Sequence, residues 1–128
     1  MEFPSFLVTT AVVGDVGLVS VSGELDLFTR DEFERALAGA QTGDRSSLIV
    51  DCSGVSFIDS SAIGVLTERA LRLKSHGGAL YVVSQDPRTI RVFEITGVDR
   101  IFQRVPTLHA ALEELVPGHA QPASVAAL

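Results

Sequence analysis

The first apolar positions of the chain fall in two short runs separated by a turn signal. Residues 6–13 are rich in β-branched and apolar side chains and stop at Gly14-Asp15, a pair typical of turns. Residues 17–22 form a second apolar run of strand length. Two short strands joined in this way predict an N-terminal β-hairpin.

A helical period follows after residue 28. Apolar side chains recur three and four positions apart at Phe33, Ala36, Leu37 and Ala40. Thr29 with Glu32 three residues later predicts a capping box, in which each side chain bonds a free backbone N–H at the other end. Phe28 and Phe33 are spaced for a hydrophobic staple across the helix start. Gly43 is the predicted stop.

The middle of the chain predicts two buried strands with a helix between them. Residues 47–52 are almost uninterruptedly apolar, which is typical of a central strand buried on both faces, and residues 79–83 repeat that pattern. The intervening helix has apolar positions on one side at Ile63, Leu66, Ala70 and Leu73. The Gly77-Gly78 pair signals its end.

The last third predicts two more helices. Asp86 is a good N-cap with Pro87 at the first helical position, and Ile90 and Phe93 mark the inner face of that helix. Residues 100–103 are expected to form a short edge strand. Pro106 then opens a final helix with apolar positions at Leu108, Ala111, Leu112 and Leu115.

This order of elements predicts an α/β fold. A β-hairpin followed by alternating helices and strands favours a mixed central β-sheet with about four helices, its middle strands parallel and its N-terminal strand at an edge. No internal repeat or linker interrupts residues 1–116. We therefore expect one domain over residues 1–116 and a flexible C-terminal tail over 117–128, which is small, polar and aperiodic.

Charge and cysteine content narrow the classes of partner. The formal net charge is -6 and the basic residues form no run, which argues against direct binding of nucleic acid or a membrane surface. Cys52 is the only cysteine, so no internal disulfide forms and a reducing compartment is expected. The N-terminus lacks the order of a signal peptide, and no apolar run approaches the ~20 residues of a membrane span. We predict a cytoplasmic protein.

The most informative segment runs from Phe57 to Leu66, with the sequence FIDSSAIGVL. An apolar stretch gives way to a helix there, so Ser60 is expected at or near the helix N-terminus, where free N–H groups and the helix dipole point. One interpretation is that Asp59 or Ser60 simply caps the helix and contributes ~1 kcal/mol. A functional role for Ser60 is the other.

Three segments together resemble one known family. The segment 57–66 is similar to the phosphorylation-site segment of anti-sigma factor antagonists, which have the STAS fold. Residues 23–26 (GELD) resemble that family's other signature, and residues 86–97 are similar to a later one. The order and spacing of the three are specific, and the resemblance covers nearly the whole domain. Ala62 stands where the family commonly has glycine, and a methyl group there changes little in a first helical turn.

The resemblance implies a transcriptional partner switch. In that family the unmodified antagonist binds an anti-sigma factor that is also a serine kinase and so frees the sigma factor, and a metal-dependent serine phosphatase reverses the phosphorylation. By position, Ser60 would be the acceptor, Asp59 its neighbour and Asp26 a residue beside it. Ser61 is the second choice of acceptor, and the partner surface would extend to Thr67. We expect a phosphoprotein without enzymatic activity, cofactor or metal, and a free monomer.

Other protein classes find less support in the residues of this chain. The main alternative is a non-catalytic STAS scaffold subunit of a larger bacterial signalling complex, which would self-associate regardless of Ser60. Asp51 ends the predicted strand as the phosphorylated aspartate of a receiver domain does, but the acidic pair that holds magnesium is missing. Cys52 lacks the arginine of a cysteine phosphatase loop, because position 58 is Ile58. No glycine-rich phosphate loop and no metal-ligand spacing of histidines occurs.

Overall fold

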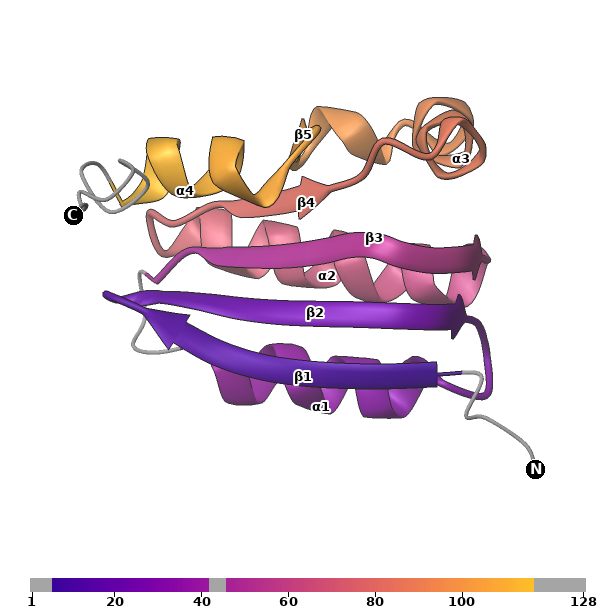
Figure 1. The fold of residues 1–128 in the computed structure, drawn as a ribbon, viewed down its shortest axis with the longest axis horizontal. Coiled ribbons are helices and arrows are strands. Elements are labelled where there is room, and N and C mark those ends of the chain that lie inside the picture. Colours follow the sequence, from indigo (N-terminus) through magenta and orange to yellow (C-terminus); the bar gives the residue numbers. More distant parts are fainter. Residues whose placement is uncertain (1–5, 42–45, 117–128) are drawn as a thin grey trace, which may run out of the picture.

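The computed structural model describes residues 6–41 and 46–116 (Figure 1). Its strands are β1 (Phe6–Val13), β2 (Val16–Leu25), β3 (Leu48–Ile58), β4 (Leu80–Val83) and β5 (Gln103–Val105). Its helices are α1 (Arg30–Ala40), α2 (Ser60–Ser75), α3 (Pro87–Thr96) and α4 (Leu108–Leu115), with a 3-10 helix, η1, at Val98–Arg100. The predicted stop at Gly43 and the predicted tail 117–128 lie outside the described residues.

The strands form one mixed sheet in the order β1-β2-β3-β4-β5. β1 pairs with β2 antiparallel as a hairpin, and every later pairing is parallel. The prediction of an α/β fold with an N-terminal hairpin and an N-terminal edge strand is therefore confirmed. Because β2, β3, β4 and β5 are parallel, their carboxyl ends all meet at one edge of the sheet.

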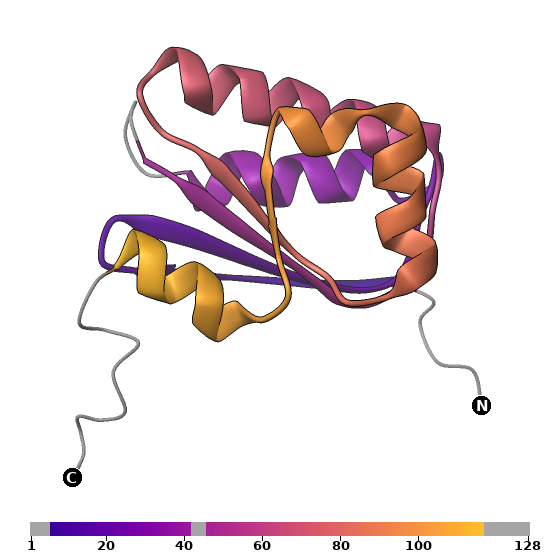
Figure 2. The ribbon, with the colours of Figure 1, turned by 90° about the horizontal axis from the view of Figure 1, so that it is seen from above.

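The helices cover the two faces of the sheet unequally. Seen from above, α1 and α2 lie on one face and α4 lies on the other (Figure 2). The larger apolar core lies under α1 and α2 and includes the fully buried Phe33, Leu37 and Leu66. A smaller core forms where α4 meets Ile49 and Val83. No helix of the described residues has the length and apolar character that crossing a bilayer requires.

The central strand is longer than its apolar run predicts. Sequence patterns suggest a strand at 47–52 and a separate apolar stretch at 55–58, whereas β3 runs without interruption from Leu48 to Ile58. Its pairing with β2 shifts register twice, between Ser20 and Ser22 and again between Gly23 and Glu24. Such irregularities absorb an extra residue and let polar and glycine positions stay in a sheet. Asp51 therefore lies within a strand, and the expectation that it ends one is wrong.

The predicted capping box and hydrophobic staple at the start of α1 are both wrong. Thr29 occupies the N-cap position, but its side chain makes no bond to the helix. Its hydroxyl instead accepts from the Asp26 N–H and donates to the Glu24 carbonyl, each at 2.9 Å. Phe28 cannot be half of a staple, because its side chain is 92% exposed while Phe33 is fully buried. The Thr29 hydroxyl is therefore used by the turn before the helix and does not cap the helix.

The last edge strand begins later than predicted. Residues 98–100 turn in η1 and the strand starts only at Gln103. The reason is Phe102, which inserts into the core with its ring 5.1 Å from that of Phe93, edge to face. On α3 the buried side chains are Thr89 and Phe93. Ile90, predicted on the inner face, is only half-buried.

Candidate functional site

The site forms where β2 and β3 end side by side. Leu25 and Ile58, the last residues of these strands, are register partners, and the Asp59 N–H donates to the Leu25 carbonyl at 3.1 Å. The chain turns from β2 into α1 on one side of this bond and from β3 into α2 on the other. The two predicted signature segments, 23–26 and 57–66, are thus brought together by backbone pairing.

Asp59 caps α2 and leaves Ser60 unengaged. The Asp59 carboxylate accepts from the backbone N–H groups of Ser61 at 2.9 Å and Ala62 at 3.3 Å. Ser60 is the first residue of α2 and is exposed. Among the described residues its hydroxyl has no hydrogen-bond partner. Of the two capping candidates that the sequence left open, Asp59 is the cap, so Ser60 is not needed for helix capping.

Ser60 lines a shallow depression between α1 and α2. The depression measures about 300 Å³ and contains Ser60 and Ser61 together with three charged side chains, Arg30, Glu34 and Glu68. Ser61 is only half-buried and its hydroxyl is also unpaired within the described residues. Both serines therefore face the same charged surface, and Ser60 is the more accessible.

Asp26 holds its own turn together. One oxygen of its carboxylate accepts from the N–H groups of Phe28 at 2.9 Å and Thr29 at 3.1 Å. This is an aspartate turn, which fixes the backbone over residues 26–29. Asp26 therefore lies on the loop that follows Leu25, next to the start of α2, and its bonded carboxylate oxygen is directed at its own backbone.

The turn at 26–29 presents an apolar tip to solvent. Phe28 is 92% exposed and Leu27 is 57% exposed, although both are large apolar side chains. Three side-chain hydrogen bonds hold the backbone behind them, so the aromatic ring projects from an ordered loop. An aromatic side chain on a pre-ordered loop loses little entropy on binding and is a typical anchor of a protein interface.

Thr67, the remaining predicted site residue, does not line the depression at Ser60. Thr67 is half-buried on α2, and its hydroxyl donates to the Ile63 carbonyl at 2.8 Å. The sequence did not indicate that Phe28 is exposed, and no local pattern singled out Glu68 as part of the site. Arg30 belongs to no run of basic residues, so no local pattern singled it out either. The pairing of β2 with β3, which brings Arg30 to Ser60, leaves no local signal in the sequence.

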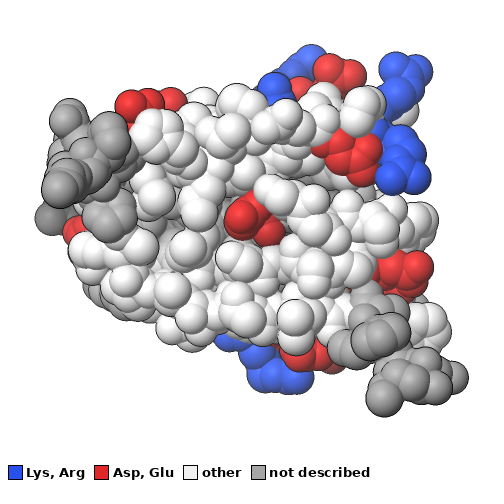
Figure 3. Space-filling view, viewed as in Figure 1, with Lys and Arg blue, Asp and Glu red and all other residues white. Residues whose placement is uncertain are grey.

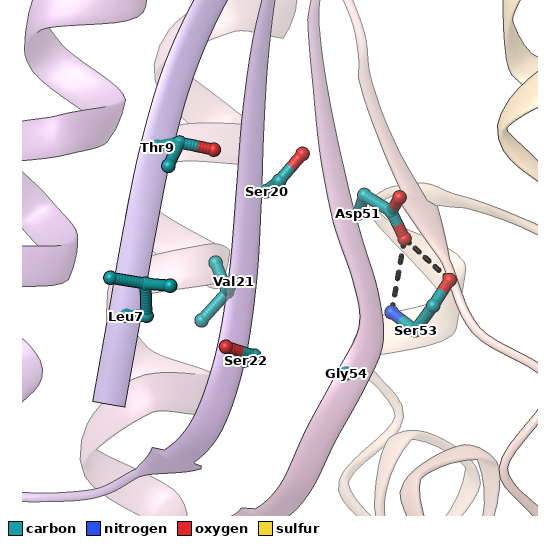
Figure 4. Close-up of a pocket in the computed structure, with 8 residues that line it drawn as sticks. All are labelled: Leu7, Thr9, Ser20, Val21, Ser22, Asp51, Ser53 and Gly54. Atoms are coloured by element: carbon teal, nitrogen blue, oxygen red, sulfur yellow. Dashed lines mark hydrogen bonds between the residues drawn. The ribbon is translucent and has the colours of Figure 1, made fainter. Parts of the chain in front are cut away.

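A second hollow lies in the sheet face that α4 leaves open (Figure 4). It measures about 230 Å³ and includes Thr9, Ser20, Ser22 and Asp51. One Asp51 oxygen accepts from the Ser53 N–H at 3.0 Å and from its hydroxyl at 2.5 Å. Asp51 is thus a hydrogen-bonded residue within a strand. Among the described residues, Asp51 belongs to no group of three His, Cys, Asp or Glu side chains that could hold the magnesium ion of a receiver domain.

Charge is sparse on this open face. Figure 3 shows a largely uncharged surface with an acidic group near its middle, and charges of both signs gathered toward the rim. No basic patch for nucleic acid is visible on the part of this face that the structure describes. Within residues 6–41 and 46–116, no three His, Cys, Asp or Glu side chains come together to hold a metal ion.

Cys52 is expected to be chemically inert in the folded protein. Burial, reinforced by the negative charge of Asp51, raises the pKa of its thiol to about 12. Because the thiolate is the nucleophile, we expect no alkylation by iodoacetamide at pH 8 until the protein is unfolded. Denatured protein of the same sample is the positive control, and rapid labelling of the native protein would contradict the assigned burial.

The same pKa shift predicts a loss of stability in alkali. Between the usual thiol pKa and about 12, the unfolded chain loses the Cys52 proton while the folded chain keeps it. The contribution of this group to the free energy of unfolding therefore falls as pH rises above about 9. Urea titrations from pH 8 to 11 measure this slope, and a Cys52→Ala variant should show a shallower one.

A model of the STAS domain family matches residues 8–114 of the chain. The chain is similar to the anti-sigma-F factor antagonist RsfB of Mycobacterium tuberculosis, with 30% identity over 108 residues, 84% of this chain and 88% of that protein. A crystal structure of an anti-sigma factor antagonist from Mycobacterium paratuberculosis matches with a TM-score of 0.78 and 32% identity, covering 90% of this chain and 98% of that one.

A more distant likeness concerns the fold alone. The Bacillus cell fate determinant SpoIIAA, solved in its unphosphorylated and phosphorylated forms, matches with TM-scores of 0.64 and 0.62 at 23% and 22% identity. The two matches each cover 85% of this chain, and 94% and 97% of SpoIIAA.

Proposed function

The chain belongs to the STAS domain family, and we propose that it is an anti-sigma factor antagonist switched by phosphorylation of Ser60. In its unmodified form it binds an anti-sigma factor, which is a serine kinase, and the sigma factor is released. Phosphorylation ends this binding, and a metal-dependent serine phosphatase restores it. The chain itself is a binding module and contributes no catalytic residue.

The observation that carries the proposal is that Asp59, and not Ser60, caps α2. Asp59 supplies the cap of α2, so the exposed Ser60 hydroxyl has no structural task. It lies beside the ordered 26–29 loop, whose Phe28 side chain is available to a partner. An accessible hydroxyl next to an apolar anchor fits a surface that one partner both binds and modifies.

Phosphorylation requires of this chain only that the kinase can reach the Ser60 hydroxyl. The Ser60 oxygen forms a bond to the γ-phosphorus of ATP, the bond from that phosphorus to the bridging oxygen breaks, and ADP leaves. The serine proton passes to a base on the kinase. The product carries about −1.5 to −2 additional charges at pH 7 in a depression that already contains Glu34 and Glu68. A helix N-terminus accommodates such a group, so partner binding is lost by charge and bulk without refolding.

The test is binding of the purified protein to candidate anti-sigma kinases with ADP, before and after incubation with ATP. Wild type, Ser60→Ala and Ser61→Ala are compared, and intact mass is recorded. We expect one added phosphate in wild type and Ser61→Ala, none in Ser60→Ala, and loss of binding only where phosphate is added. No phosphate and no binding with any kinase would favour the scaffold alternative instead.

Two glycines in helices offer a matched pair for locating the partner surface. Gly64 lies on α2 and lines the Ser60 depression, whereas Gly39 lies on α1 outside that depression. A methyl group at either position would meet open space. Alanine at each should raise the free energy of unfolding by about 0.5–1 kcal/mol. Only Gly64→Ala should also weaken binding of the anti-sigma factor, because its methyl group occupies the depression. Calorimetric binding and urea titrations measure both effects, and equal affinities would place the partner elsewhere.

A further inference from the structure

Among the described residues, Arg30 is the one cationic side chain that lines the depression at Ser60, and the fold sets its position. α1 and α2 follow neighbouring parallel strands, so their first residues, Arg30 and Ser60, occupy equivalent places at the same edge of the sheet. Both side chains reach the depression between the helices. Arg30 is therefore the cation that the described structure brings to the Ser60 end of the site.

Within the part of the chain that the structure describes, Arg30 makes only one weak ion pair. Its Nε lies 3.4 Å from a carboxylate oxygen of the adjacent residue Asp31, and the two side chains are 45% and 72% exposed. A contact of this length at the surface is easily exchanged for a better one. The guanidinium presents five N–H donors in a planar fork, which matches the oxygens of a phosphate group.

The two acidic side chains of the depression, Glu34 and Glu68, interact with cations other than Arg30. Glu68 lies 3.9 Å from Arg72 on α2. Glu34 and Glu68 both act to raise the pKa of Arg69, although burial lowers that pKa overall. Cations of α2 thus partly balance the two carboxylates, whereas among the described residues Arg30 has an ion pair only with its neighbour Asp31.

We propose that Arg30 binds the phosphate of phosphorylated Ser60, so that the modified side chain is held against this chain between α1 and α2. This inference rests on the proposed function for the identity of Ser60 as acceptor. Charge-assisted hydrogen bonds from the guanidinium to the phosphate oxygens bridge the two helices. They offset the repulsion from Glu34 and Glu68 and make the doubly ionised phosphate the favoured form.

The test measures the second pKa of phosphoserine at position 60 by phosphorus NMR in the full-length chain. Phosphoserine is introduced during translation at position 60, so no kinase is needed and the result does not depend on whether Ser60 is the natural acceptor. Wild type is compared with Arg30→Gln, and Arg35→Gln, an exposed arginine on α1 outside the depression, is the matched control. Glu34→Gln and Glu68→Gln remove the opposing charges.

We expect Arg30→Gln to raise the phosphoserine pKa by roughly half a unit to one unit, because a nearby cation favours the dianion. Arg35→Gln should leave it unchanged, and Glu34→Gln and Glu68→Gln should lower it. The Asp59 cap is common to all variants and cancels. An equal pKa in wild type and Arg30→Gln would overturn the inference. Failure of every kinase to modify Ser60 would instead refute the proposed function and leave the measured contact standing.

Discussion

Replacing Phe28 with serine is expected to weaken binding of the anti-sigma factor by roughly thirty-fold or more, equivalent to about 2 kcal/mol, without destabilising the fold. The side chain is 92% exposed, so its removal costs the isolated protein almost no packing. In a complex the same ring would be buried, and aromatic anchors at the centre of an interface contribute energies of this size.

The order of the 26–29 loop is what makes this effect large. Asp26 and Thr29 hold the loop through hydrogen bonds of 2.9–3.1 Å before any partner arrives. Calorimetry on unphosphorylated protein measures the change. Val12→Thr is the control, because Val12 is 55% exposed but pairs with Gly17 at the opposite end of the sheet. Unchanged affinity of Phe28→Ser would remove the 26–29 loop from the interface.

Replacing Gly17 with alanine is expected to reduce the free energy of unfolding by about 3 kcal/mol or more. Gly17 lies at the start of β2, and a Cβ atom there would overlap the Ala40 carbonyl oxygen and come within 2.5 Å of Leu48 Cδ2. The main obstacle is backbone at the end of α1, which cannot rotate away. The helix would have to lift from the sheet.

A matched substitution separates this clash from a general effect of alanine. Gly39→Ala adds the same methyl group one residue before Ala40, where it meets open space, and should slightly stabilise the protein. Urea and thermal titrations of both variants measure the difference, with a lower melting temperature by roughly 10 °C or more for Gly17→Ala. Equal stability of the two variants would contradict the close approach of α1 to β2.

Local sequence signals predicted most of the elements, and they limited the cap of α2 to Asp59 or Ser60. The apolar periods of α2 and α4 and the start of α3 at Pro87 all depend on residues within a few positions of each other, and the structure confirms them. The cap of α2 at Asp59 likewise depends only on residues next to it in the sequence. Where two local devices competed for one residue, the pattern was insufficient: the Thr29 hydroxyl could serve a capping box or the turn at Asp26, and it serves the turn.

Errors in strand length have a common physical cause. A strand ends where pairing with its neighbours ends, which is a property of two segments. β3 continues past Asp51 because β2 also continues to Leu25 and the two remain paired through register shifts. The late start of β5 depends on Phe102 packing on Phe93 across the core. Neither partner can be identified from the strand's own residues.

The sequence by itself determined the types and order of the elements, the edge position of β1 and the placement of Ser60 at a helix start, because these depend on periodicity, capping and chain order. Only the tertiary structure decided which side chains surround Ser60. Arg30 lies 30 residues before Ser60 along the chain and lines the same depression because parallel β2 and β3 bring α1 and α2 to the same edge. The tight contact at Gly17 likewise arises from packing between separate elements, α1 and β2, which no local pattern encodes.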